Sequence, residues 1–434
     1  VKRGSTFWIE DNAWGNLYGY VADRLGSAGN RPNVSLAGGT LTLNGANYAV
    51  EMSQTLGDLI LASGPSTVTA TWVAGTPKLV FSSLVPTKGA FVNFTGTLLG
   101  NGVNDARILF PTAPTNVVGG GGVAGTRTMS IVTGARSVND LVCYDVYGIR
   151  ALVTPEYNEV VNNDINGALA TENVKIANAV PVIFAPLSAP RTNNSLTITA
   201  AATATWAMSN TLTLASGQLL STPNATLNII SGVLTAGSGS AIDFDVTIMQ
   251  NITTFGANIN DNGAGSITLV KNGAGTLSLT NGTDNTFSGG TFVNEGALTT
   301  GSITNRRYLG TGAVKVDNAT LTLGQGGATG FGEADQAGYT ALNGGQISIA
   351  NAAYTNATDR FNIGAGCIIA GNATTTITNG LNSLTRVSSL SGISGGQVVL
   401  APGSVVAFGG ALTFGLGTDI QTLAGGAGTA GDVY

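Results

Sequence analysis

The sequence predicts an all-β protein built from short stacked strands. Only 9% of the 434 residues are charged, so Lys and Glu, which favour helices, are scarce. The chain also holds 63 glycines and a hydrophobic fraction of 43%, enough apolar material for a core. A short phrase recurs along it, in which apolar residues alternate with Thr, Ser or Asn between Gly or Asn turns, the pattern of a β-strand with one buried face.

Copies of this phrase predict the individual strands. It reads GGTLTLNG from Gly38, GTLSLTNG from Gly275, ATLTLG from Ala319 and GGQVVLAPG from Gly395. Side chains alternate across a strand, so the apolar residues of each copy share one face. The copies follow one another at irregular intervals of roughly 10 to 26 residues, which favours the coils of a solenoid over the blades of a propeller.

Stacking explains why such short strands would be stable. A five-residue strand cannot bury its apolar face alone, but identical strands above and below it close a narrow core and pair the backbone. Asn281-Gly282 and Gly289-Gly290 then mark corners between faces of a coil. We predict that six apolar residues stack as inward-facing rungs of this core: Leu277, Leu279, Val293, Leu298, Leu321 and Leu323.

One stretch carries a family resemblance. GAGTLSLTNGTDNTFSGGTFVNEGALTTG, from Gly273 to Gly301, resembles the autotransporter-associated β-strand repeat, most closely that of very long planctomycete and verrucomicrobial surface proteins. The resemblance implies a right-handed parallel β-helix with inserted loops, exposed outside a bacterial cell as a stalk, fibre or adhesin. The chain departs from the repeat at Phe292, where the family has a small polar residue, and Phe292 and Val293 cannot both point into the core.

The pattern divides the chain into four parts. Residues 1–35 form an irregular, aromatic-rich end, and residues 36–136 form coils. An insertion is expected at residues 137–190, where charges and prolines gather. Coils resume over residues 191–434, with the repeat at residues 265–302. We predict an interface with another chain at Trp8 and Trp14 of the first part and at Leu412 and Phe414 of the last.

Residue types exclude several kinds of chemistry. There is no histidine, which removes Ser-His-Asp and Cys-His catalysis and the commonest transition-metal ligand. The 18 basic residues are outnumbered by 23 acidic ones, so nucleic-acid binding is not expected. Asp243 and Asp245 in AIDFDV are interpreted as a solvent-facing pair, opposite Phe244, and Glu333 and Asp335 as a surface loop. No metal or cofactor is predicted.

These observations favour a structural protein of the cell surface, a rod-like module of a fibre, stalk or sheath that assembles with further copies or with more of the same chain. An adhesin that binds glycans or other cells is the alternative. A carbohydrate-active β-helix enzyme is a second alternative, which the sparse carboxylates disfavour. No apolar run reaches the length of a membrane-spanning helix. Cys143 and Cys367 are too far apart on a solenoid to form a disulfide within one chain.

Overall fold

The computed structural model describes residues 1–10, 23–45, 51–72, 75–177, 182–199, 202–222, 226–301, 307–324, 339–343 and 345–349, and the backbone of short strands beyond residue 352. The predicted fold class is confirmed, because parallel strands stack into a β-solenoid of about 11 turns among the described residues. Contacts divide the chain into two compact units. Unit 1 is Val1–Glu159, Ala168–Lys175 and Asn193–Leu196, and unit 2 is Val160–Gly167, Ile176–Thr192 and Thr197–Tyr434.

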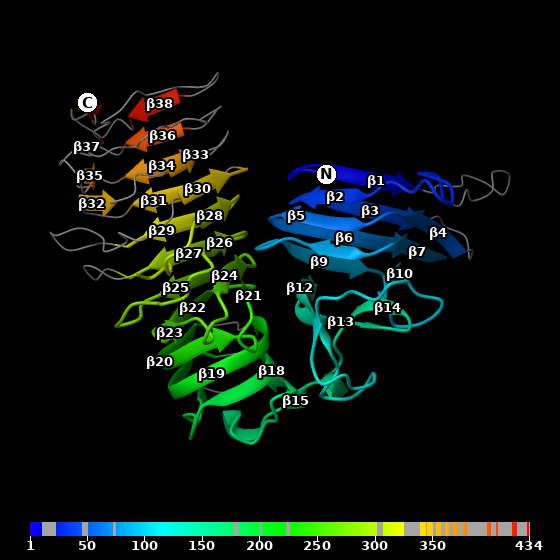
Figure 1. Ribbon diagram of the computed structural model, residues 1–434, viewed down its shortest axis with the longest axis horizontal. Helices are drawn as coiled ribbons and strands as arrows, with labels where there is room; N and C mark the ends of the chain where they lie inside the picture. Colours follow the sequence, from blue (N-terminus) through cyan, green and yellow to red (C-terminus); the bar gives the residue numbers. More distant parts are fainter. Residues whose placement is uncertain are drawn as a thin grey trace. The chain divides into compact units, whose positions relative to one another are not determined.

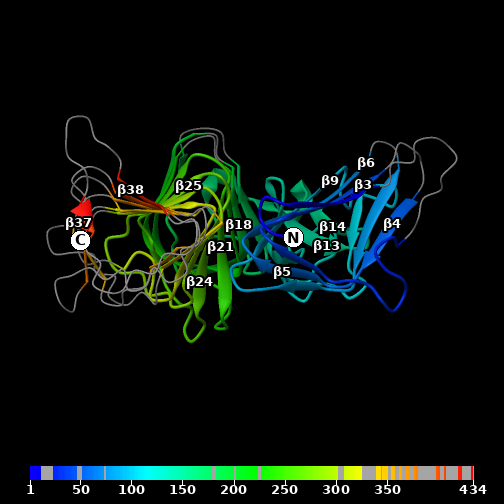
Figure 2. The same cartoon turned by 90° about the horizontal axis from the view of Figure 1, so that it is seen from above.

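Unit 1 stacks its parallel strands in three sheets (Figure 1). The first sheet contains β1 (Thr6–Glu10), β3 (Thr40–Gly45), β6 (Pro65–Trp72), β9 (Phe91–Gly96) and β12 (Ile131–Ser137). The second contains β4 (Glu51–Leu56), β7 (Thr76–Phe81) and β10 (Arg107–Leu109), and the third β2 (Val34–Ala37), β5 (Leu59–Ser63) and β8 (Leu84–Pro86). Figure 2 looks along the stack, so β3, β6 and β9 overlap while β4 and β5 lie on other sides of the unit.

The core of unit 1 follows from the alternation in these strands. Leu41 of β3 lies beside Val68 of β6, which lies beside Phe94 of β9, and all three are fully buried. Leu59 of β5 stands between Val34 and Leu84 in the same way. Each rung therefore adds apolar side chains to one continuous column, and the solenoid interior is filled by stacked residues of consecutive turns.

The two ends of unit 1 differ in regularity. Within residues 1–35, Thr6–Glu10 is a regular strand whose five residues pair in parallel with β3. At β12 the strand pairing becomes antiparallel. Strand β12 pairs with β11 (Val117–Val118) and β13 (Asp140–Asp145), and β13 pairs with β14 (Gly148–Ala151). The 3-10 turn η1 (Thr154–Glu156), β15 (Asn158–Glu159) and β16 (Asn173–Ile176) follow, and β18 (Arg191–Ile198) has residues in both units.

Unit 2 begins with η2 (Val161–Asn163) and continues as stacked parallel strands. Its main sheet includes β17 (Val182–Ile183), β19 (Ala204–Ser221), β20 (Leu227–Ala236), β21 (Ile242–Ile248), β22 (Ile252–Phe255), β23 (Asn258–Ile259), β24 (Ile267–Asn272), β25 (Thr276–Leu279), β26 (Thr291–Val293), β27 (Ala297–Thr300), β28 (Val314–Asp317), β29 (Thr320–Leu323), β30 (Tyr339–Leu342) and β31 (Gln346–Ile349). The same sheet continues through β33 (Phe361–Ile363), β34 (Ile368–Gly371), β36 (Gln397–Leu400) and β38 (Asp419–Thr422). A second sheet contains β32 (Ala353–Asn356), β35 (Thr376–Asn379), β37 (Val405–Val406) and β39 (Asp432–Val433).

Corners of unit 2 are held by glycine backbone and asparagine side chains. Gly290, before β26, has φ +95°, a conformation that glycine adopts without steric cost. Asn285 links three successive turns: its Oδ1 accepts from the Ile259 amide at 2.8 Å and its Nδ2 donates to the Tyr308 carbonyl at 2.6 Å. Asparagine at these corners therefore pairs backbone groups that the strands leave unpaired.

The solvent-facing interpretation of the Asp243 and Asp245 pair is wrong for Asp245. Asp245 is 1% exposed, and Gln218 and Asn272 of the neighbouring turns donate side-chain hydrogen bonds to its carboxylate. Asp243 is half-buried. Alternation placed both residues opposite Phe244 correctly, but the outward side of this sheet is itself covered at Asp245, and amide side chains there compensate for the lost solvation of the carboxylate.

Candidate functional site

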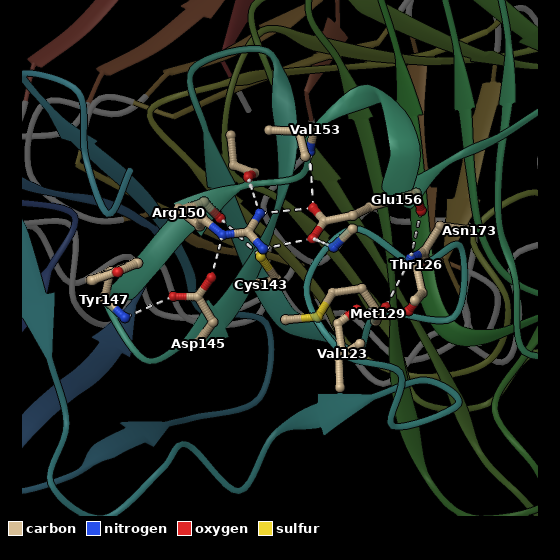
Figure 3. Close-up of polar contacts among 12 residues, drawn as sticks. Val123, Thr126, Met129, Cys143, Asp145, Tyr147, Arg150, Val153, Glu156 and Asn173 are labelled. Carbon is tan, nitrogen blue, oxygen red and sulfur yellow. Dashed lines mark hydrogen bonds and ion pairs between the residues drawn. The ribbon is translucent and has the colours of Figure 1, made fainter. Parts of the chain in front are cut away.

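Three charged side chains meet in unit 1 where the parallel rungs give way to the β13–β14 hairpin. The guanidinium of Arg150 donates through Nη1 and Nη2 to the two carboxylate oxygens of Glu156, at 2.7 and 2.6 Å. Its Nε donates to Asp145 Oδ2 at 2.6 Å. Figure 3 shows Arg150 between the two carboxylates. Glu156 is fully buried and Arg150 nearly so. We call these three residues the Arg150 cluster.

Local backbone structure places each carboxylate. Asp145 ends β13, and its Oδ1 accepts from the Tyr147 amide at 2.8 Å, which shapes the tight turn into β14. Gly148, the first residue of β14 after this turn, has a φ of +97°. Glu156 closes the single turn η1, where its carboxylate also accepts from the amides of Val153 at 3.0 Å and Gly125 at 2.9 Å. Four donors therefore converge on one buried carboxylate.

The electrostatics of the cluster follow from these contacts. Burial acts to raise the pKa of Glu156, but the hydrogen bonds from Arg150 and from the Gly125 and Val153 amides outweigh it and lower that pKa. Hydrogen bonds to Glu156 raise the pKa of Arg150 above its usual range, against the effect of burial. Both partners are thus held in their charged forms, and the pair is a bidentate salt bridge inside the protein.

An asparagine connects the cluster to its surroundings in unit 1. Asn173, fully buried on β16, donates through Nδ2 to the Met129 carbonyl at 2.8 Å and to the Glu156 carbonyl at 3.4 Å. Its Oδ1 accepts from Ser195 Oγ at 2.9 Å and from Asn194 Nδ2 at 2.7 Å. This network ties η1 to neighbouring segments that do not follow the repeat.

Cys143 lies beside the cluster and is chemically inert there. It is a free, fully buried thiol whose Sγ donates to the Arg150 carbonyl at 3.7 Å. Burial raises the pKa of the Cys143 thiol to about 12, so the thiolate that would react is absent at neutral pH. The free thiol agrees with the prediction that Cys143 does not form an intrachain disulfide. Cys367 lies outside the described residues.

The Arg150 cluster therefore has a structural role. All three guanidinium nitrogens donate to carboxylates, which leaves no charge directed at a substrate. The described residues hold no group of three His, Cys, Asp or Glu side chains that could bind a metal ion. The cluster fixes the β13–β14 hairpin to η1.

The residues predicted as rungs lie where consecutive strands stack. Leu277 pairs with Leu298, and Leu298 with Leu321, in successive strands β25, β27 and β29. All six predicted rung residues are buried, none more than 1% exposed: Leu277, Leu279, Val293, Leu298, Leu321 and Leu323. Phe292, beside Val293, is half-buried and points the other way, where the Lys315 ammonium lies 5.3 Å from its ring centre.

The predicted interface residues fall partly within the described structure. Trp8 is 59% exposed on β1. Trp14, Leu412 and Phe414 lie outside the described residues, as do Glu333 and Asp335. The sequence indicated that charged residues gather between residues 137 and 190, but it did not predict which of them form ion pairs. A usable signal was the short spacing from Asp145 through Arg150 to Glu156, with Pro155 starting a turn.

Two comparisons bear on the class of protein. Residues 269–299 match the family model of the passenger-associated transport repeat. Over 402 residues the chain is 28% identical to the adhesin BmaC autotransporter of Brucella suis biovar 1 (strain 1330), an alignment that covers 86% of this chain and 11% of that protein. The chain thus spans about a tenth of its relative's length. No solved structure matches it significantly.

The predicted resemblance to autotransporter-associated repeat proteins is confirmed by these matches, although they do not test the planctomycete and verrucomicrobial detail. Together with the stacked parallel rungs, they support a passenger of the autotransporter type, at the cell surface or outside the cell. No helix in the described part of the chain is long and apolar enough to cross a membrane.

Proposed function

We propose that this chain is a section of the passenger of a bacterial adhesin. In this proposal the stacked rungs form a stiff support, and residues on their outward faces contact the surface to which the cell adheres. The solenoid suits this role because each turn adds length while burying its own apolar side chains, and outward positions vary without disturbing the core.

The observation that carries the proposal is that the matched repeat forms the rungs themselves. Residues 269–299 include β25, β26 and most of β27, and Leu277 and Leu298 within them stack in register. The repeat therefore contributes turns of a solenoid like that expected of a passenger. The relative that aligns along most of the chain is named an adhesin, which favours adhesion over other passenger functions.

Surface display tests the proposal. Bacteria that carry the chain outside a heterologous outer-membrane anchor should adhere to cultured epithelial cells severalfold more than bacteria that carry the anchor alone. Purified chain added beforehand should reduce this adherence in proportion to its concentration, because it occupies the same receptors. Adherence no greater than that of the anchor control, at equal display measured by surface labelling, would contradict the proposal.

Assembly into a fibre or sheath is a second and finer proposal. Strand β1 pairs along one edge with β3, and among the described residues its other edge has no strand partner. Such an edge offers backbone groups to a further strand, from another copy or from more of the same polypeptide. Scattering that shows monodisperse single rods at high concentration would count against self-assembly of this chain.

A further inference from the structure

We infer that unit 1 carries a binding site for neutral glycans on the outward face of its first sheet, centred on Trp8. This inference rests on the proposed adhesin function and names the ligand class of one surface. The site, called the Trp8 face, is the outward side of β1, β3, β6 and β9. Its main residues are Trp8, Thr40, Thr42, Thr67, Thr69 and Thr95.

Trp8 is the exceptional residue on this face. The indole is 59% exposed, whereas its neighbours Phe7 and Ile9 point toward the core of unit 1. Among the described residues, no aromatic ring and no cation packs on the Trp8 ring. Phe292 of unit 2, which also points outward, instead has the Lys315 ammonium 5.3 Å from its ring centre. Tryptophan is enriched among the residues that carry most of the binding energy of a contact surface, so the uncovered Trp8 ring is where a ligand gains its largest apolar contact.

Around Trp8 the sheet presents hydroxyl groups at a regular spacing. Parallel register places Trp8 beside Thr42, Thr42 beside Thr69 and Thr69 beside Thr95, about 4.8 Å apart from strand to strand. Thr40 and Thr67 form a second row two residues along. Thr42 is shielded, but Thr40 and Thr67 are half-exposed, and no side chain among the described residues hydrogen-bonds to either hydroxyl. Both therefore remain available to a ligand.

The charge of the face narrows the ligand class. Glu10 is the one charged residue among the outward positions of β1, β3, β6 and β9, and the nearby Arg24 guanidinium donates to the Glu10 carbonyl at 3.1 Å. A nucleic acid or sulfated polymer needs clustered cations, which this face lacks. The buried core of a protein–protein interface is more apolar than the rest of the surface, whereas Trp8 stands among hydroxyls.

A pyranose ring can contact both the exposed Trp8 ring and the threonine hydroxyls of the face. One side of the sugar is a plane of C–H groups that packs on an indole, and its edge carries hydroxyls that exchange hydrogen bonds with threonine. A neutral glycan can thus cover the Trp8 ring and reach the rows of Thr40 and Thr67 without bringing an unpaired charge to the surface.

The test is binding of the purified chain to an array of immobilised neutral and anionic glycans. Neutral glycans should be retained, and Trp8→Ala should weaken binding at least about tenfold because the central aromatic contact is lost. Trp8→Phe should recover most of it by restoring an aromatic face, and Thr67→Val should weaken it severalfold. Phe292→Ala, which removes an outward aromatic residue of unit 2, is the matched control and should bind like the wild type.

Because Trp8 is exposed, Trp8→Ala should leave the thermal unfolding midpoint unchanged, which separates lost binding from lost folding. Retention of anionic glycans alone, no retention of any glycan, or equal binding by Trp8→Ala and the wild type would each overturn the inference. If Trp8→Ala and the wild type bind the array equally and both displayed chains still adhere to cells, the glycan site is wrong and the adhesin proposal stands. If neither adheres but the array result depends on Trp8, the adhesin proposal fails alone.

Discussion

Replacing Leu277 by Asp is expected to lower the free energy of unfolding by at least about 4 kcal/mol. Leu277 is fully buried and stacks on Thr253 of one neighbouring turn and Leu298 of the other. The substitution removes the apolar contact with Leu298 and places a charge in the core, where a single Thr253 hydroxyl does not replace the hydration of a carboxylate. Denaturant unfolding followed by circular dichroism measures the loss.

Ser278→Asp is the matched control, since it introduces the same charge one residue away. Ser278 points to the half-exposed outward side of β25, beside Thr254 and Thr299. Its substitution should change the free energy of unfolding by no more than about 0.5 kcal/mol. Similar destabilisation by the two substitutions would mean that the assignment of inward and outward faces is incorrect.

Glu156→Gln is expected to destabilise unit 1 by about 3–5 kcal/mol, because it leaves the buried Arg150 guanidinium without the carboxylate it pairs with on two nitrogens. Glu159→Gln provides the control. The Glu159 carboxylate forms an ion pair with Lys175 Nζ at 3.5 Å but is 43% exposed, and losing such a pair should cost less than about 1 kcal/mol. Equal effects of the two substitutions in denaturant unfolding would show that the Arg150 cluster contributes no special stability.

Lowering the pH should remove the contribution of the Glu156 carboxylate to the free energy of unfolding. Its pKa in the folded protein lies below the ordinary value of 4.5, so the stabilisation is complete above that value and is lost as the pH falls through the folded-state pKa. Glu156→Gln should therefore flatten the fall in stability below pH 4.5. Burial raises the pKa of Asp140, so its titration changes the stability with the opposite sign, and the difference between wild type and variant is the quantity to follow.

The rungs could be predicted from the sequence because local alternation and stacking agree. In Thr276–Leu279 each apolar residue is separated from the next by one small polar residue, and only one side of the strand can then join a core. The same rule separated Phe292 from Val293. Because the same sequence phrase recurs along the chain, it also predicts similar strands above and below each one. The fold class and the inward-facing residues could therefore be predicted without knowledge of long-range contacts.

Other features depend on contacts that alternation does not encode. Lys271 occupies an inward position between Val246 and Val293, where its ammonium donates to the carbonyls of Asn272, Gly273 and Glu295. A lysine in a strand ordinarily indicates the solvent side. The carbonyls that accept from this ammonium lie at corners of the coil, and the alternation within the strand does not predict them. The Arg150 cluster lies outside the repeat altogether, in segments whose pairing has no periodic signal.

A cysteine cross-linking measurement tests most directly that the rungs stack in parallel and in register. With Cys143 and Cys367 replaced by alanine, new cysteines at Ser278 and Thr299 occupy register partners on adjacent strands, about 4.8 Å apart and within the roughly 7 Å that a disulfide allows. Cysteines at Ser278 and Ala297 lie on the same adjacent strands but two residues out of register, about 8 Å apart. The parallel β-solenoid predicts rapid oxidation of the first pair and little of the second; efficient cross-linking of the second pair, with the first pair remaining free, would contradict it.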